Sequence, residues 1–145
     1  MHRAAPRALR VVLDTNVIVS GLLGPGSVPA QAAAHVFVRR SEWLVDPRIV
    51  EEYRRVLSRP HFRFVEADVQ DVLLRADLFA TWVHADPLPI TLPDPTDVAF
   101  LEVAIAGGAD ALVTGNVKDY QIRGGGKLDI AVVTPRQFLD LLARR

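Results

Sequence analysis

The sequence predicts an α/β fold in which a mostly parallel central sheet carries helices on both faces. Short, continuous apolar runs alternate along the chain with helical segments, and the connections between them are short. A strand without polar alternation is typical of a sheet that is covered on both sides. Repetition of strand and helix with short connections favours βαβ units, which build a parallel sheet.

Four apolar runs are predicted to be strands. Residues 10–14 (RVVLD) form a β-branched run that ends in an aspartate, and the other runs are residues 43–45, 111–113 and 130–133. β-branched side chains favour extended backbone, so these runs are the expected members of the sheet.

The expected helices begin with recognisable caps. In each case a side-chain oxygen can accept a bond from a free backbone N–H, and a proline supplies the φ of a first helical residue. The starts are Asp46-Pro47, Asp94-Pro95 and Thr134-Pro135, with Ser27 to Pro29 as a looser start for a helix reaching Arg40.

Size and composition predict one domain over residues 1–145, with residues 1–9 as a flexible N-terminal lead. Half of the residues are hydrophobic and 23% are charged, as in average soluble proteins. The lack of cysteine excludes disulfides, a thiolate zinc site and a cysteine nucleophile. The apolar run at residues 11–23 is interrupted by Asp14 and Asn16 and is too short to span a bilayer, so we expect a cytoplasmic protein outside the membrane.

The formal net charge is zero, which counts against a wide basic surface for nucleic acid. One short stretch, residues 48–63, is nevertheless rich in arginine. It is either a solvated helix face or a set of phosphate contacts, for which the planar guanidinium is well suited. The second interpretation assigns phosphate contacts to Arg48, Arg55 and Arg59.

Acidic residues follow the predicted strands. Asp14 closes the first strand, Asp97 lies in the first turn of the helix after Asp94, and Asp119 follows the strand at residues 111–113. Ligands of parallel sheets bind outside the carboxyl ends of the strands, so we expect these side chains at one edge. Taken alone, Asp97 is better explained by a capping role or by interaction with the helix dipole. Asp14 ends a buried strand and requires a partner, because an unpaired buried carboxylate costs several kcal/mol.

Helix geometry separates Glu51 from Glu52. At about 100° per residue, the apolar side chains of the helix predicted over residues 47–58 span one arc. Glu51 points nearly opposite the centre of that arc, whereas Glu52 lies on its flank, beside the core. Glu52 is therefore expected to face a site, the alternative being a boundary glutamate paired to Arg48 or Arg55. The apolar residues are Ile49, Val50, Tyr53, Val56 and Leu57.

Clustered carboxylates without a basic partner repel one another, so they take up protons or bind a cation. Oxygen ligands without cysteine select a hard divalent ion, Mg²⁺ or Mn²⁺, which can activate a water for attack on a phosphodiester. The four histidines lack zinc spacing, and the sequence contains no Walker loop, dinucleotide fingerprint or nucleophile-elbow serine.

Four segments resemble the PIN-domain family, in the right order and over nearly the whole chain. Within the family they are most similar to the bacterial toxins of toxin–antitoxin systems related to VapC. The resemblance implies a Rossmann-like three-layer α/β/α sandwich and a Mg²⁺- or Mn²⁺-dependent endoribonuclease. It also implies an RNA substrate, a cognate antitoxin protein and a homodimer. The segments are VVLDTNVIVSGLL (11–23), DPRIVEEYRRVLSRPHF (46–62), DPTDVAFLEVAIAGGADALVTGN (94–116) and VVTPRQFLDLL (132–142).

Carried over by position, the resemblance implies a catalytic and metal-binding site of Asp14, Glu52 and Asp97. Polar residues that orient such a cluster in the family fall on Thr15, Asn16 and Thr114.

The chain departs from the family at the fourth acidic position. Many relatives have aspartate there, whereas this chain has Asn116, with Asp119 three residues later. An amide brings no charge, so a second ion would be held less tightly. Either Asp119 supplies the missing carboxylate, or the site holds one metal ion, or activity is weak or lost.

Three other functions are compatible with the sequence. A PIN nuclease outside toxin–antitoxin systems would process RNA or act on DNA. A degenerate PIN domain would bind RNA or protein without catalysis, which Asn116 favours. A receiver-like phospho-switch also has carboxylates at a sheet edge, but it needs a second acidic residue where Thr15 and Asn16 follow Asp14.

Overall fold

The computed structural model describes residues 7–122 and 129–145, and within them five strands form one all-parallel sheet. The strands are β1 (Arg10–Leu13), β2 (Glu42–Val45), β3 (Thr81–Trp82), β4 (Ala111–Val113) and β5 (Val132–Val133). Their order in the sheet is β3-β2-β1-β4-β5, so β1 occupies the centre. The register pairs Val11 with Trp43 on one side and with Ala111 on the other.

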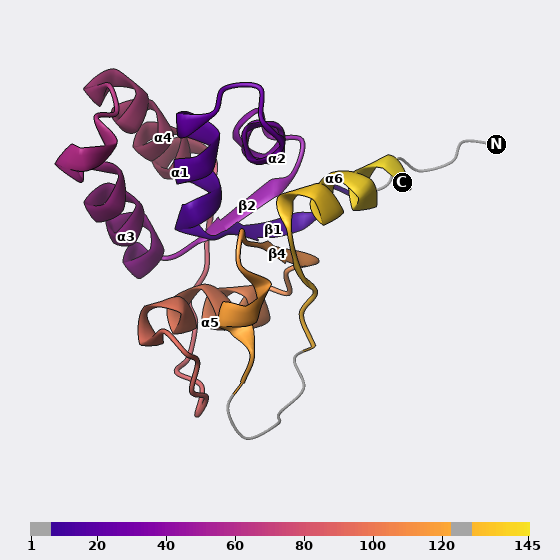
Figure 1. Ribbon diagram of the computed structural model, residues 1–145. Helices are drawn as coiled ribbons and strands as arrows, with labels where there is room; N and C mark the ends of the chain where they lie inside the picture. The colour runs from indigo at the N-terminus through magenta and orange to yellow at the C-terminus, as the bar shows by residue number, and fades with distance from the viewer. Residues whose placement is uncertain (1–6, 123–128) are drawn as a thin grey trace.

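The helices form a layer on each side of the sheet. They are α1 (Thr15–Leu23), α2 (Val28–Phe37), α3 (Pro47–Leu57), α4 (Glu66–Phe79), α5 (Val98–Ala106) and α6 (Pro135–Ala143), with 3₁₀ turns η1 (Pro60–Phe62), η2 (Pro95–Asp97) and η3 (Val117–Tyr120). α5 lies on one face, against β1, β2 and β4, whereas α1, α2 and α6 lie on the other (Figure 1). α3 packs against α4 beside β2. This is the three-layer α/β/α arrangement predicted from the sequence.

The core is built on the central strand. Val11, Val12 and Leu13 are fully buried, as are all three residues of β4. Strands covered on both faces have no side that needs polar residues, which is why their sequence does not alternate. No single described helix has the length and apolar composition of a membrane span, although α1 and α2 meet both criteria as a pair bent by 115°.

The predicted caps are present in the structure. The Asp46 carboxylate accepts a hydrogen bond from the backbone N–H of Ile49 at 3.0 Å and starts α3. Ser27, Asp94 and Thr134 accept bonds from backbone N–H groups in the same way at the starts of α2, η2 and α6. Asp46 and Thr134 directly follow β2 and β5, so these two caps also fix where the chain leaves the sheet.

Several predicted boundaries were wrong. α2 ends at Phe37 instead of reaching Arg40, because Arg39 adopts a left-handed conformation with φ 68°. β5 is half as long as predicted. β3 and α4 were not predicted at all: β3 has two residues, and α4 exposes Leu74 and Leu78, which blurs its amphipathic pattern.

The predicted N-terminal lead falls partly outside the described residues, which begin at Arg7. Within the described part, Arg7 pairs with Asp110 at 2.7 Å. Leu9 is buried, and its carbonyl accepts a hydrogen bond from the Glu42 backbone N–H at 2.8 Å. Leu9 therefore belongs to the folded core and extends the pairing of β1 with β2.

Candidate active site

The carboxyl ends of the strands open into a hollow of about 450 Å³ that is lined by acidic side chains. Asp14 comes directly after β1, Asp97 closes η2 before α5, and Asp119 lies in η3 after β4. Glu52 reaches the same hollow from α3. The structure thus brings together the four carboxylates that the sequence singled out, and we call Asp14, Glu52, Asp97 and Asp119 the acidic cluster. In Figure 1 this edge lies on the left, and α6 lies on the opposite side of the molecule.

Asp14 is buried and held by two hydroxyl groups. Its Oδ2 accepts hydrogen bonds from Thr114 Oγ1 and from the Tyr120 hydroxyl, both at 2.9 Å. Burial raises the pKa of Asp14, the two hydroxyl donors lower it, and the charge of Glu52 raises it further. The partners that the sequence argument required for Asp14 are therefore neutral donors, which orient the carboxylate without cancelling its charge.

Asp97 is 7% exposed, and within the described residues its carboxylate accepts no hydrogen bond. Asp97 occupies the N-cap position of α5, where its charge can interact with the helix dipole, but its side chain makes no capping hydrogen bond. Burial raises the pKa of Asp97 to about 7, and the charges of Asp14, Asp94, Asp119 and Glu52 contribute in the same direction. A cation in the hollow would therefore stabilise the ionised form of Asp97, which burial and the neighbouring charges disfavour.

Glu52 faces the hollow, as the helical arc predicted. Its Oε2 accepts a hydrogen bond from Thr15 Oγ1 at 3.1 Å, and its Oε1 contacts Arg55 Nη2 at 2.9 Å. The side chain of Glu52 is 17% exposed, whereas that of Glu51 is 69% exposed and pairs with Arg54. Both interpretations of Glu52 therefore hold, since it pairs with an arginine and also lines the site.

We expect Glu52→Gln to lower the phosphodiester hydrolysis that the family resemblance implies by about tenfold or more, because it removes a negative charge from the hollow and keeps the shape of the side chain. Glu51→Gln is the matched control and should leave the rate within the range of a surface substitution. Steady-state rates of the two variants at saturating metal ion check this. Equal losses in both variants would contradict the assignment.

Asp119 completes the acidic cluster with the help of Asn116. Asn116 Nδ2 donates a hydrogen bond to Asp119 Oδ1 at 3.0 Å, and Asn116 does not line the hollow itself. The negative charge of Asp119 also contributes to the raised pKa of Asp97. The geometry thus favours Asp119 as the fourth carboxylate and gives Asn116 the role of orienting it.

We expect Asp119→Asn to reduce activity about tenfold and to raise the Mg²⁺ concentration needed for half-maximal rate, since the hollow loses charge that offsets dehydration of the ion. Lys118→Gln, on the same exposed turn, is the control. Titration of the rate with Mg²⁺ measures both quantities. An unchanged rate with unchanged Mg²⁺ dependence would leave a site of three carboxylates.

Polar residues link the strand ends into one frame. Asn16 Oδ1 accepts a hydrogen bond from the Gly115 backbone N–H at 2.8 Å, and Asn16 Nδ2 donates to Thr114 Oγ1 at 3.3 Å. The supporting positions inferred from the resemblance therefore all have contacts at this edge. Sequence reasoning missed Tyr120, whose pKa is raised by burial and by the charge of Asp14, so that it remains a hydrogen-bond donor. It also missed that Asp94 lines the hollow in addition to starting η2.

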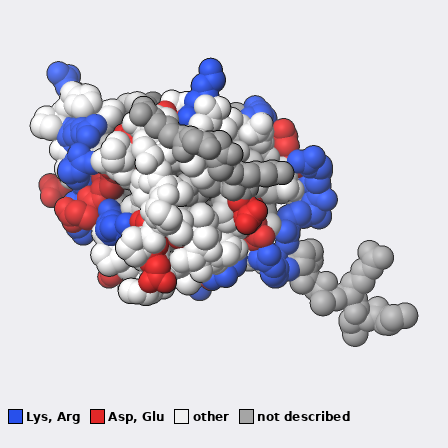
Figure 2. Space-filling model, turned by 90° about the horizontal axis from the view of Figure 1, so that it is seen from below, with Lys and Arg blue, Asp and Glu red and all other residues white. Residues whose placement is uncertain are grey.

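The three arginines predicted to contact phosphate have different surroundings. Arg55 and Arg59 line the hollow beside the acidic cluster. Arg48 instead donates to Asp46 at 2.8 Å and to the buried Glu102 at 2.7 Å. On the face seen in Figure 2, basic and acidic side chains are interspersed along the margins instead of forming one broad basic patch. Positive charge near the acidic cluster therefore comes from Arg55 and Arg59, which line the hollow, and no broad basic patch is seen on this face.

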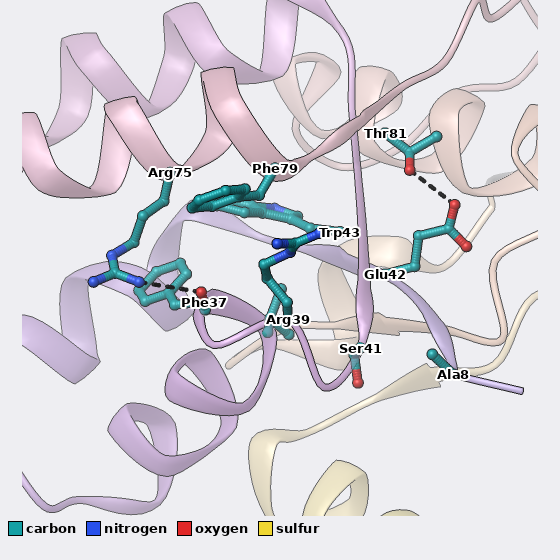
Figure 3. Close-up of a pocket in the computed structure, with 10 residues that line it drawn as sticks. Ala8, Phe37, Arg39, Ser41, Glu42, Trp43, Arg75, Phe79 and Thr81 are labelled. Atoms are coloured by element: carbon teal, nitrogen blue, oxygen red, sulfur yellow. Dashed lines mark hydrogen bonds between the residues drawn. The ribbon is translucent and has the colours of Figure 1, made fainter. Parts of the chain in front are cut away.

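A second hollow, of about 250 Å³, lies at the opposite end of β2 (Figure 3). Arg39 stacks on Phe79 at 4.7 Å from the ring centre, and the rings of Phe37 and Trp43 are 5.1 Å apart. Glu42 is the acidic residue that lines it, and this carboxylate is bonded to Arg10 and Thr81. Since this hollow has a single carboxylate among the described residues, which is already bonded, it does not compete with the acidic cluster as a reactive site.

The donor set of the acidic cluster fits a hard divalent cation. Its ligands are carboxylate oxygens, and the carboxylate of the largely buried Asp97 opens into the hollow. Across residues 7–122 and 129–145, no three acidic or histidine side chains already surround one point at ligand spacing. Mg²⁺ usually keeps several waters and takes one or two carboxylates directly, so Asp14 and Asp97 would suffice to hold it.

An all-parallel sheet with an acidic hollow at its carboxyl edge places the protein among α/β proteins that act on ligands at that edge. The family model described as PIN domain matches residues 10–118. The chain therefore belongs to the PIN-domain family. PIN domains are generally nucleases and typically use divalent metal ions. Among proteins with curated descriptions, none matches the chain.

Proposed function

We propose that this protein is a Mg²⁺- or Mn²⁺-dependent endoribonuclease and the toxin of a toxin–antitoxin pair. The observation that carries the proposal is the acidic cluster of a PIN domain, with Asp97 buried among four other carboxylates and its pKa raised to about 7. An ionised carboxylate in this position destabilises the folded protein when no cation is bound, and it becomes a ligand when a cation is present.

A bound divalent ion would supply Lewis acidity and a more acidic water molecule. Asp14 and Asp97 would hold the ion, because they are the most buried carboxylates of the hollow. Thr114 and Tyr120 keep Asp14 in one orientation through their hydroxyl groups. Arg55 and Arg59 lie at the same hollow and would contact the phosphates on either side of the scissile bond.

RNA as the substrate and a toxin role are supported by the similarity of the four sequence segments to VapC-related toxins. The same similarity supports a cognate antitoxin protein and a cytoplasmic location. A homodimer is further supported by large apolar side chains that are exposed on α4 and β3, since apolar residues are buried when such elements form an interface. These side chains are Leu74, Leu78, Phe79 and Trp82.

The test compares cleavage of an end-labelled RNA and of a DNA with the same sequence in EDTA, Mg²⁺ or Mn²⁺. We expect internal cleavage of RNA that requires a divalent ion. Expression of the protein in a bacterial host should stop growth, and co-expression of a short DNA-binding protein encoded beside its gene should restore growth. Preferred cleavage of DNA, or normal growth together with specific RNA processing, would favour a nuclease outside toxin–antitoxin systems. RNA binding without cleavage would favour a non-catalytic domain.

A further inference from the structure

A separate hollow of about 440 Å³ lies between α3 and the start of α5, beside the acidic cluster. Glu52, Arg55 and Thr96 line both hollows, so the two form a continuous path along the surface. Its volume falls within the roughly 300–1,000 Å³ of small-ligand sites. A nucleic-acid strand that places a phosphate at the acidic cluster can therefore continue into the hollow between α3 and α5.

The two walls of this hollow differ in chemistry. The α5 wall is apolar and consists of Pro95, Val98 and Ala99, with the buried ring of Phe100 behind them. The α3 wall carries the guanidinium groups of Arg48 and Arg55 together with the carboxylates of Glu51 and Glu52. An apolar wall that faces guanidinium groups is suited to a nucleobase attached to a phosphate, since bases pack on apolar or guanidinium planes while phosphates pair with arginine.

Arg48 is fixed in place on the α3 wall. Its Nε and Nη2 contact Asp46 Oδ2 at 2.8 Å, and its Nη1 donates to Glu102 Oε1 at 2.7 Å. Glu102 is 4% exposed and also accepts from the Leu88 backbone N–H at 2.6 Å. The Arg48 side chain is nevertheless 49% exposed. Because Asp46 and Glu102 hold its guanidinium, Arg48 offers a rigid, flat surface. Phosphate pairing at this wall falls to Arg55, which is exposed and is held by Glu52 through Nη2 at 2.9 Å.

We propose that this hollow binds the base of the nucleotide next to the scissile phosphate, between Arg48 and the apolar wall of α5, and so determines which sequences are cut. The inference rests on the proposed ribonuclease function. It assigns Ala99 as a specificity-determining residue, because Ala99 is half-buried in the apolar wall and a larger side chain there would fill the space of a base.

Binding is measured by fluorescence anisotropy of a labelled single-stranded RNA dodecamer in EDTA, with the Asp14→Asn protein as parent. We expect Ala99→Phe in this parent to weaken binding about tenfold, the size of one lost base contact. Ala106→Phe introduces the same change at the exposed end of α5, outside both hollows, and should bind as the parent does. Equal binding of all three proteins would overturn the inference.

An abasic nucleotide moved along the dodecamer tests the same contact without altering the protein. One position next to the cleavage site should lose about tenfold in affinity with the parent, and this loss should vanish in Ala99→Phe. If every position behaves alike, no base is bound in this hollow.

Hydrolysis of bis(p-nitrophenyl) phosphate by the native protein, with Asp14→Asn as the negative control, separates this inference from the proposed function. This small diester needs only the acidic cluster, so the native protein should hydrolyse it with Mn²⁺ whether or not a base is bound between α3 and α5. Native protein that hydrolyses neither the diester nor RNA would refute the nuclease function itself. Hydrolysis of the diester together with unaltered RNA binding by Ala99→Phe would refute only the base site.

Discussion

Asp14→Asn is expected to lower the rate of RNA hydrolysis by at least about 100-fold. Loss of a residue that only supports a metal ligand costs up to about 100-fold, and Asp14 would contact the ion itself. Asp14 lies where the central strand ends, and its orientation is fixed by Thr114 and Tyr120. Asparagine can still accept both hydroxyl hydrogen bonds through its amide oxygen, so the fold should persist. What is lost is the negative charge in the hollow.

The measurement combines single-turnover cleavage with calorimetric titration of Mn²⁺. Binding of Mn²⁺ should weaken in parallel with the rate, and the circular dichroism of Asp14→Asn should match that of the native protein. Tyr120→Phe is an informative companion, since it removes one hydroxyl donor and leaves the charge; a smaller loss is expected, of about tenfold. Native-like activity in Asp14→Asn would exclude this site as the centre of the reaction.

Asp97→Asn is expected to stabilise the metal-free protein while removing its activity. The carboxylate is buried near four other carboxylates, and its pKa is raised from 3.8 to about 7. The neutral amide of nearly the same shape avoids the cost of ionising this group in the folded state. We expect the Tm in EDTA at pH 8 to rise by at least about 3 °C, which corresponds to about 1 kcal/mol in a domain of this size. A lower Tm would contradict this account.

The same substitution should change how stability depends on pH. Because the folded protein holds a proton on Asp97 more tightly than the unfolded chain does, the contribution of Asp97 to the free energy of unfolding should fall as pH rises from about 4 to about 7. This fall should be smaller in Asp97→Asn, with a remainder due to Asp14, whose pKa is also raised. Urea unfolding at a series of pH values in EDTA measures the slope. Equal slopes in both proteins would show that Asp97 titrates normally.

The sequence by itself determined the class of fold and the edge at which the acidic residues meet. Continuous apolar runs and capped helix starts reflect local backbone geometry, so they predict strands, helices and their order. The spacing of Glu52 from Ile49 and Val56 was enough to place it beside the core, because helical periodicity is a local property. For the same reason the sequence failed at β3, where two residues are too few to form a pattern.

Only the tertiary structure decided how the site is held together. Tyr120 donates to Asp14 across 106 residues, and Arg48 meets the buried Glu102 across 54. No local pattern marks such pairs, because they depend on which strand ends become neighbours in the sheet. The tertiary structure also placed Asn116 against Asp119 and opened the hollow between α3 and α5. Local periodicity therefore specifies the elements, whereas the pairing of charges and the shape of the hollows arise only when distant segments pack.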